Sequence, residues 1–297
     1  MSLLSLDNIN VAVASPQNTL NSHEFDLFRE YIARECGISL GKEKAYLVES
    51  RLAKLVVENG CNNFSEFYHK VRSGLDPALK TKVIDAMTTN ETLWFRDESP
   101  FTILKDYILP MYQQRFAKGQ QSELRIWSGA CSTGQEPYSI VMTVKEYDDA
   151  HPGHPYAIYP RLKIMATDIS TSALMIAKMA RYDGIAISRG LPDSYKEKYF
   201  DNQGRVFALK PEIKTPIEFR AFNLQDSLFP LGKFDIIFLR NVAIYFSTDF
   251  KTELFRKLTT SLNPQGYLFL GSSESLNGYS NDFETKLYER GAVFQLK

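Results

Sequence analysis

The chain has 297 residues, and its 35 basic and 35 acidic side chains give a formal net charge of zero. This length allows two domains with real cores, and without a long basic run nucleic acid is not the expected partner. No apolar run could span a bilayer and residues 1–15 lack the basic start of a signal peptide, so we expect no membrane insertion. Cys36, Cys61, Cys131 and the four histidines lack metal-ligand spacing, which predicts reduced thiols, a cytoplasmic protein and no metal site.

Residues 1–20 are polar and are predicted to form a flexible arm, whereas residues 21–90 show only helical patterns. The first expected helix starts at Asn21 or Ser22 and ends at Gly37, and the second ends at Asn59-Gly60. A third helix, at 64–72, ends at Gly74, and Asp76-Pro77 starts a fourth. No strand pattern interrupts this region. It therefore predicts an N-terminal all-α domain.

The second of these helices places Lys44, Arg51 and Lys54 in a stripe beside its apolar face. Such charges commonly form only the solvated edge of a helix. The alternative is an electrostatic contact with an acidic partner, and the sequence leaves both interpretations open.

Between residues 91 and 297, predicted strands and helices alternate, which is typical of an α/β fold with a doubly wound parallel sheet. A long helix is expected from Ser99-Pro100 to about Lys118. Strands are expected at Leu124–Ser128, Leu162–Asp168, Ile217–Phe222, Phe234–Leu239 and Gly266–Leu270, with a last antiparallel strand at Gly291–Leu296. Residues 190–216 break the alternation with a hairpin pattern, so they predict a small β insertion.

The most informative segment is a strand, a turn of small residues from Gly129 to Gly134, and the start of a helix. Such a loop brings backbone groups and a helix N-terminus to a ligand. In the dinucleotide fingerprint the second glycine lets the backbone approach a pyrophosphate, but Cys131 occupies that position here. Glu136, just inside the helix, would repel phosphate and attract a cationic or hydroxyl-bearing ligand. A helix-capping role for Glu136 is the alternative.

Polar residues also follow the other predicted strands, at the edge where ligands bind in open α/β sheets. Asp168 stands where a carboxylate would accept ribose hydroxyls, with a helix N-cap as its alternative role. Asn223-Leu224 could bind the edge and face of an adenine. Arg240-Asn241 follow a buried strand, and Tyr245, four residues on, would by itself be assigned to the core. Residues 88–97 combine polar groups with two large aromatic side chains, so this link is expected to fold over the ligand.

Together these motifs resemble the CheR family of chemotaxis-receptor glutamate methyltransferases, from about residue 22 to residue 296. The motifs that carry the resemblance are Thr89-Asn90-Glu91-Thr92, Phe95-Arg96-Asp97, the Gly129–Ser139 loop, Asp168, Asn223-Leu224, Arg240-Asn241-Val242 and Ile244-Tyr245-Phe246. The resemblance implies a class I S-adenosylmethionine (SAM)-dependent methyltransferase domain, Rossmann-like and with an inserted β subdomain, behind the all-α domain. Trp94 stands where the family often has Phe.

The resemblance also implies the roles of individual residues. The residues expected to surround SAM are Asn90, Thr92, Arg96, Gly129, Glu136, Asp168, Asn223, Leu224, Arg240 and Asn241. Arg96 and Tyr245 are expected to lie nearest the reacting carboxylate. The implied reaction transfers a methyl group from SAM to glutamate side chains of chemoreceptors, leaving S-adenosylhomocysteine (SAH).

The implied partner is the cytoplasmic helical domain of a chemoreceptor, with its methylation helices. Some family members bind a receptor C-terminal peptide through a longer, Gly-containing hairpin loop. Here Asp201 to Gly204 leads directly into the strand at Arg205, which predicts an enzyme without that tether, and we expect a monomer. The alternatives are a SAM-binding regulatory module without turnover and a methyltransferase of small molecules, while Cys131 disfavours a NAD-dependent oxidoreductase.

Overall fold

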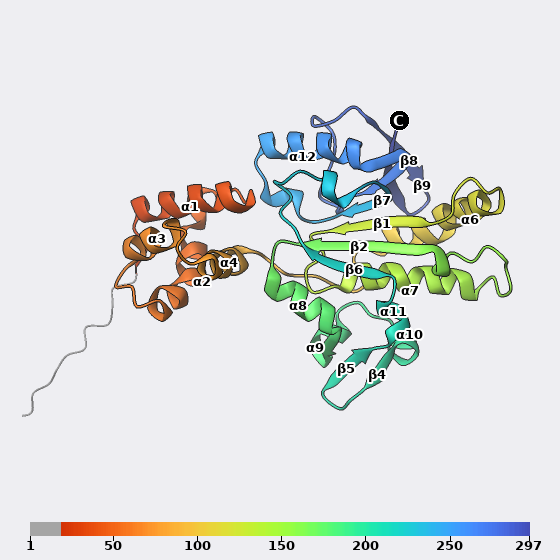
Figure 1. Ribbon diagram of the computed structural model, residues 1–297, viewed down its shortest axis with the longest axis horizontal. Helices are drawn as coiled ribbons and strands as arrows, with labels where there is room; N and C mark the ends of the chain where they lie inside the picture. Colours follow the sequence, from red (N-terminus) through yellow and green to blue (C-terminus); the bar gives the residue numbers. More distant parts are fainter. Residues whose placement is uncertain (1–18) are drawn as a thin grey trace, which may run out of the picture.

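The structure is a computed structural model that describes residues 19–297, so the expected arm at 1–20 lies almost wholly outside the described residues. Figure 1 shows two bodies, a helical domain at the N-terminal end and an α/β domain formed by the rest of the chain. Within residues 19–297, no helix has both the length and the apolar character needed to cross a membrane.

The helical domain has its own core, in which the ring of Phe28 packs against Phe64, Phe67 and Tyr68. Its elements are α1 (Ser22–Cys36), the 3-10 turn η1 (Lys42–Lys44), α2 (Ala45–Glu58), α3 (Phe64–Arg72) and α4 (Pro77–Met87). Asn21 forms a capping box with Glu24 at the start of α1, and Gly37 ends that helix at φ 76°. Asp76 caps α4, which has Pro77 at its first position. The predicted all-α unit is confirmed.

The α/β domain is built on a seven-stranded sheet in the order β6-β2-β1-β7-β8-β10-β9. The strands are β1 (Leu124–Gly129), β2 (Leu162–Asp168), β6 (Ile217–Ala221), β7 (Phe234–Leu239), β8 (Leu262–Phe269), β9 (Phe283–Tyr288) and β10 (Gly291–Leu296). Strands β6, β2, β1, β7 and β8 run parallel, while β10 pairs antiparallel with β8 and β9. The parallel sheet with an antiparallel last strand is therefore confirmed.

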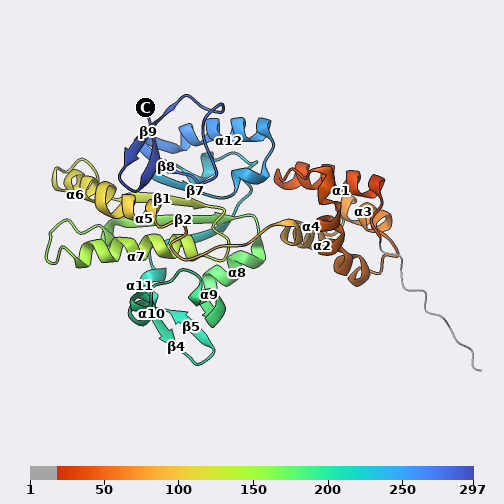
Figure 2. The same cartoon turned by 180° about the vertical axis from the view of Figure 1, so that it is seen from behind.

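Helices cover both faces of the sheet (Figures 1 and 2). The helical elements outside the insertion are α5 (Ser99–Ile103), the π-helical turn η2 (Leu104–Ile108), α6 (Leu109–Ala117), α7 (Gln135–Asp149), α8 (Thr171–Met179) and α12 (Thr248–Ser261), with 3-10 turns η3 (Tyr159–Arg161), η4 (Phe229–Leu231) and η5 (Ala243–Tyr245). Because successive strand residues face opposite ways, Ile126 and Ile236 pack with α5, α6 and α7, whereas Trp127 and Ile237 pack with α12. The long helix expected from Ser99 is present, with the π turn inside it.

Two strand predictions differ from the structure. Strand β8 begins at Leu262, four residues before the expected Gly266. Strand β9 was not expected, because its sequence shows no clear apolar alternation; three of its six side chains are exposed. It forms because β10 supplies backbone partners along its whole length.

The insertion is a three-stranded antiparallel sheet in the order β3-β5-β4. Its elements are β3 (Arg181–Asp183), α9 (Gly184–Ser188), α10 (Asp193–Tyr199), β4 (Phe200–Asn202), β5 (Val206–Leu209) and α11 (Pro211–Lys214). Strand β3 lies before the expected range of 190–216. Its three residues are too few to show a strand pattern in the sequence.

Candidate active site

A cavity of about 450 Å³ lies at the carboxyl ends of the parallel strands, between the two domains. Its lining includes all the sequence-predicted site residues except Gly129: Asn90, Thr92, Arg96, Glu136, Asp168, Asn223, Leu224, Arg240, Asn241 and Tyr245. The helical domain contributes Ile38, Ser39, Lys44 and Leu47 to the same cavity. The fold thus brings together residues from every strand end that the sequence singled out.

The segment before α5 is held tightly by its two aromatic residues. Trp94 is buried, and its Nε1–H donates to the Ala186 carbonyl oxygen at 3.0 Å in the insertion. The Phe95 backbone N–H donates to Ser139 Oγ at 3.1 Å on α7. Phe95 and Asp97 have φ values of 48° and 66°, a strained backbone that persists only when its surroundings enforce it. Arg96, between these anchored residues, is therefore held at the cavity.

The loop after β1 is folded back on the end of β2. The Cys131 N–H donates to the Thr167 carbonyl oxygen at 2.9 Å, and the Ser132 N–H donates to Asp168 Oδ2 at 2.7 Å. The Cys131 side chain is buried against Ala166 and Leu174, so it faces the interior and fits the loop. Burial raises the pKa of this thiol well above its usual value.

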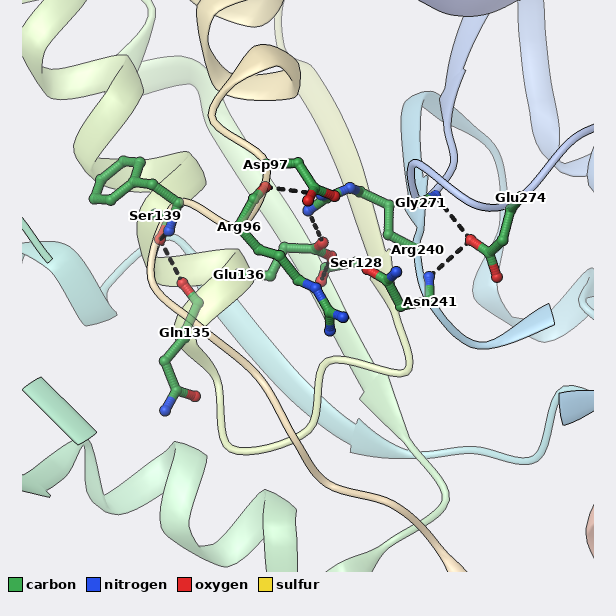
Figure 3. Close-up of polar contacts among 11 residues, drawn as sticks. Arg96, Asp97, Ser128, Gln135, Glu136, Ser139, Arg240, Asn241, Gly271 and Glu274 are labelled. Carbon is green, nitrogen blue, oxygen red and sulfur yellow. Dashed lines mark hydrogen bonds and ion pairs between the residues drawn. The ribbon is translucent and has the colours of Figure 1, made fainter. Parts of the chain in front are cut away.

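A charge cluster stands beside the loop (Figure 3). Arg240, whose side chain is 1% exposed, donates to Glu136 Oε2 at 3.1 Å and to Asp97 Oδ2 at 2.7 Å. Ser128 Oγ donates to the other oxygen of Glu136 at 2.7 Å. Two carboxylates share one guanidinium, so the cluster keeps an excess of negative charge. Figure 3 shows the Arg96 guanidinium outside this network, and no polar partner for it occurs within residues 19–297.

Asp168 is the buried carboxylate of the site, with 6% of its surface exposed. Each oxygen accepts one backbone N–H, from Ser132 at 2.7 Å and from Ser170 at 2.8 Å. Burial raises its pKa above the usual value, while these two bonds act in the opposite direction. A carboxylate oxygen accepts more than one hydrogen bond, so both oxygens can still receive ligand hydroxyls.

Both domains are similar to known protein families. Residues 23–88 match the CheR methyltransferase all-alpha domain, and residues 90–291 match the CheR methyltransferase SAM binding domain. The chain belongs to the CheR methyltransferase family. Its curated relatives include chemotaxis protein methyltransferase Cher2 of Pseudomonas putida and chemotaxis protein methyltransferase 1 of Pseudomonas aeruginosa. Each is 44% identical over 275 residues, which cover 92% of this chain and 98% of the relative. Chemotaxis protein methyltransferase 1 of Vibrio cholerae is 42% identical over 280 residues, covering 94% and 98%.

This CheR methyltransferase is a SAM-dependent methyltransferase with the two-domain architecture that its sequence indicated. Some of the residues predicted for its site have additional roles in the structure. Asn223 Nδ2 donates to the Glu35 carbonyl oxygen at 2.8 Å, and its Oδ1 accepts the Gln225 N–H at 3.0 Å. The amide expected to bind adenine is therefore engaged with the helical domain. Leu224 is buried and lines the cavity as expected.

Gly129 does not line the cavity. A Cβ atom there would stand 2.8 Å from Leu239 Cδ1 and 3.3 Å from the Trp127 ring. A glycine is needed at this position because the neighbouring side chains approach its backbone closely. Gly129 therefore packs at the end of β1, and its contact with the cofactor stays a prediction.

The basic stripe needs a correction in its central member. Arg51 Nη1 donates to the carbonyl oxygens of Met87 at 2.8 Å and Thr88 at 3.0 Å, and Nη2 donates to Thr89 Oγ1 at 3.1 Å. Arg51 thus binds the end of α4 and the link that follows. Lys44 belongs to η1 and lines the cavity, and Lys54 is exposed beside Glu58.

The sequence interpretation missed Glu274, which lies just beyond β8. Its carboxylate accepts the N–H groups of Asn241, Val242 and Gly271, and so holds the segment that carries Arg240 and Tyr245. The signal was available, since a polar residue after a parallel strand is what identified Asp168 and Asn223. No polar site residue was predicted after strand β8.

Proposed function

We propose that the protein transfers a methyl group from SAM to glutamate side-chain carboxylates of chemoreceptors, forming methyl esters, and that it does so in the cytoplasm. The observation that carries this proposal is the pair Arg96 and Tyr245. Both line the cavity, and neither the Arg96 guanidinium nor the Tyr245 hydroxyl has a polar partner within residues 19–297. A cationic and a neutral donor at one cavity suit an incoming carboxylate. The relatives named chemotaxis protein methyltransferases support a chemoreceptor as the substrate.

The residues present fit SAM. The excess negative charge around Glu136 and Asp97 suits a ligand that carries a sulfonium and an ammonium group. Asp168 offers carboxylate oxygens to ribose hydroxyls, and Leu224 offers an apolar surface to a base. Asn241 Oδ1 is buried without a donor among the described residues, as an acceptor reserved for a ligand would be.

SAM, when bound, supplies the methyl group, and the protein's own task is alignment. A glutamate with a pKa of about 4.3 is ionised at neutral pH, so no general base is required. Well-oriented reactants gain up to roughly 7–11 kcal/mol, and Arg96 and Tyr245 would orient the carboxylate. We expect an edge contact from Arg96, because a tight bidentate clamp would stabilise the ionised ground state and lower its nucleophilicity.

Lys44 and Lys54 are the proposed contacts to the acidic methylation helices of the receptor. Lys44 is half-buried at the cavity wall, and the Lys54 side chain is 84% exposed. A cation at the cavity mouth would guide an acidic helix toward Arg96. Esterification removes one negative charge from the receptor, which reduces repulsion between its neighbouring helices.

The β insertion is proposed to bind no receptor C-terminal peptide. Strands β4 and β5 are short, and only residues 203–205 connect them. A short hairpin offers few backbone groups to which a peptide strand could be added. The enzyme would then recognise the methylation helices directly.

The test is methyl transfer by the purified protein from SAM to receptor-containing membranes. Glutamate methyl esters are base-labile, so methanol released by mild base separates them from methylated nitrogen. The expected result is base-labile label that disappears when the glutamates of the methylation helices are replaced by alanine. Binding of SAH without any transfer, or transfer that is base-stable, would contradict the proposal.

Cofactor binding is checked separately by calorimetry with SAH. Asp168→Ala should weaken binding by roughly 1–3 kcal/mol, the cost of a lost hydrogen bond to a charged group. Asp201→Ala, in the exposed hairpin, is the matched control and should leave the affinity unchanged. Equal affinity of the two variants would remove Asp168 from the cofactor site.

A further inference from the structure

The carboxylate of Glu274, in the loop after β8, organises the segment between Arg240 and Tyr245 (Figure 3). Glu274 Oε2 accepts the backbone N–H of Asn241 at 2.7 Å and that of Gly271 at 2.7 Å. Oε1 accepts the N–H of Val242 at 3.0 Å and that of Ile244 at 3.3 Å. Bonds from N–H groups to a charged acceptor are about twice as strong as neutral ones. A single side chain thus satisfies four backbone donors at the end of β7 and β8.

The backbone that Glu274 holds is unusual. Asn241 has φ 57°, in the left-handed region that L-residues seldom occupy. At Gly271 a Cβ atom would stand 2.6 Å from Asn241 Nδ2 and 2.9 Å from the Asn241 backbone N. The two segments therefore approach so closely that one of them needs a glycine. Such a conformation persists only when surrounding contacts enforce it, and the four bonds to Glu274 do so.

Tyr245 lies directly on this held segment. Its N–H donates to the Val242 carbonyl oxygen at 3.1 Å in η5, and the N–H of Val242 itself is bound by Glu274. On the other side, the Tyr245 carbonyl oxygen accepts the Ser39 N–H at 2.8 Å, and Ile38 forms a β-bridge with Phe246. The backbone of Tyr245 is therefore fixed between Glu274 and the helical domain.

We propose that Glu274 is a positioning residue for methyl transfer, setting the direction in which the Tyr245 hydroxyl meets the substrate carboxylate. This inference rests on the role given to Tyr245 in the proposed function. Glu274 itself does not line the cavity, so it acts through the backbone it binds. Loss of Glu274 should therefore lower kcat, because a displacement of reactive groups by about 1 Å can lower the rate about a hundredfold.

Glu274→Gln is the decisive variant. Each oxygen of Glu274 accepts two N–H groups, so an amide NH₂ would face two donors in either orientation of the side chain. We expect kcat to fall about ten- to hundredfold, with KM for the receptor changed less than about threefold. Glu289→Gln makes the same change of charge in the exposed turn after β9 and should leave kcat unchanged.

A double-mutant cycle separates positioning of Tyr245 from general loss of structure. In a Tyr245→Phe background the hydroxyl is already absent, so Glu274→Gln should lower kcat by less than about threefold. Glu274→Asp keeps the charge and should retain more activity than the glutamine variant. If Glu274→Gln does not fold, the same cycle is run with Glu274→Asp.

Equal loss of kcat in both backgrounds, or no loss at all, would overturn the positioning role while methyl transfer by the wild-type enzyme stands. Failure of the wild-type enzyme to form base-labile esters would instead contradict the proposed function, and this inference with it. The same assay distinguishes the two failures: the wild-type enzyme tests the proposed function, and the Glu274 variants test the positioning role.

Discussion

Arg240 and Glu136 are 104 residues apart in the chain, yet their side chains form an ion pair with an N–O distance of 3.1 Å at the cavity wall. The guanidinium also binds Asp97 and the Arg96 carbonyl oxygen, so it joins the end of β7 and the start of α7 to the segment before α5. Because the Arg240 side chain is only 1% exposed, this pair is shielded from solvent.

Replacing Arg240 should therefore destabilise the protein. Arg240→Met keeps most of the volume but leaves Glu136, whose side chain is 13% exposed, without its cation, at a cost of about 3 kcal/mol in free energy of unfolding. Urea unfolding measures this. The matched control is Arg220→Met, whose pair with Glu218 is exposed, with an expected loss of under about 1 kcal/mol. Equal losses of unfolding free energy in Arg240→Met and Arg220→Met would show that the buried ion pair stabilises the protein no more than the exposed one.

The pKa of Asp168 predicts a dependence of stability on pH. Burial raises this pKa in the folded state, so ionisation of Asp168 lowers the free energy of unfolding of the ligand-free protein. The stability that the group contributes is complete below its ordinary pKa and is lost as pH rises through the raised value.

The neutral variant Asp168→Asn does not titrate, so its free energy of unfolding relative to wild type should increase from pH of about 4 to neutral pH. Urea titrations of both proteins across this range give the difference directly. The opposite slope would mean that the hydrogen bonds from Ser132 and Ser170 outweigh burial and lower the pKa.

Arg96 and Tyr245 should fail in different ways. Tyr245→Phe removes only a hydroxyl, so kcat should fall about tenfold or more while SAH affinity stays close to wild type. Arg96→Ala should lower both kcat and SAH affinity, because Arg96 is assigned to cofactor and substrate together. Steady-state kinetics and calorimetry separate the two effects. The exposed Tyr46→Phe serves as control, and wild-type turnover by Tyr245→Phe would make Tyr245 a packing residue.

Receptor docking should depend on Lys44 and Lys54. Changing both to Glu should raise the apparent KM for receptor membranes at low ionic strength and leave SAH affinity unaltered. The effect should shrink as salt is added, because exposed charges are screened over about 8 Å at physiological ionic strength. Arg51 is excluded from this variant since it binds the carbonyl oxygens after α4. Unchanged receptor kinetics at low salt would leave these lysines as solvated surface.

Titration with receptor C-terminal pentapeptides should show no binding to the β insertion. The whole enzyme is used, with calorimetry as the readout and SAH as a positive control for folded protein. Micromolar binding that is lost when residues 203–205 are changed would overturn this expectation.

Local signals predicted much of the fold because they depend on neighbours along the chain. Asn21 with Glu24 and Asp76 with Pro77 each cap a helix whose start was expected at or beside them. Strand β9 was not predicted because its sequence shows no clear apolar alternation, and only pairing with β10 makes it a strand.

The amino-acid sequence was enough to predict which strand ends meet at the site, because parallel strands place their carboxyl ends on one edge of the sheet. The contacts that each of these residues makes there depend on the three-dimensional fold. Asn223 binds the Glu35 carbonyl oxygen across 188 residues, Arg240 is shared between two carboxylates, and Glu274 binds three N–H groups that lie 30–33 residues away in the chain. Buried polar groups must find partners wherever the fold supplies them, and those partners are set by three-dimensional proximity that no local pattern encodes.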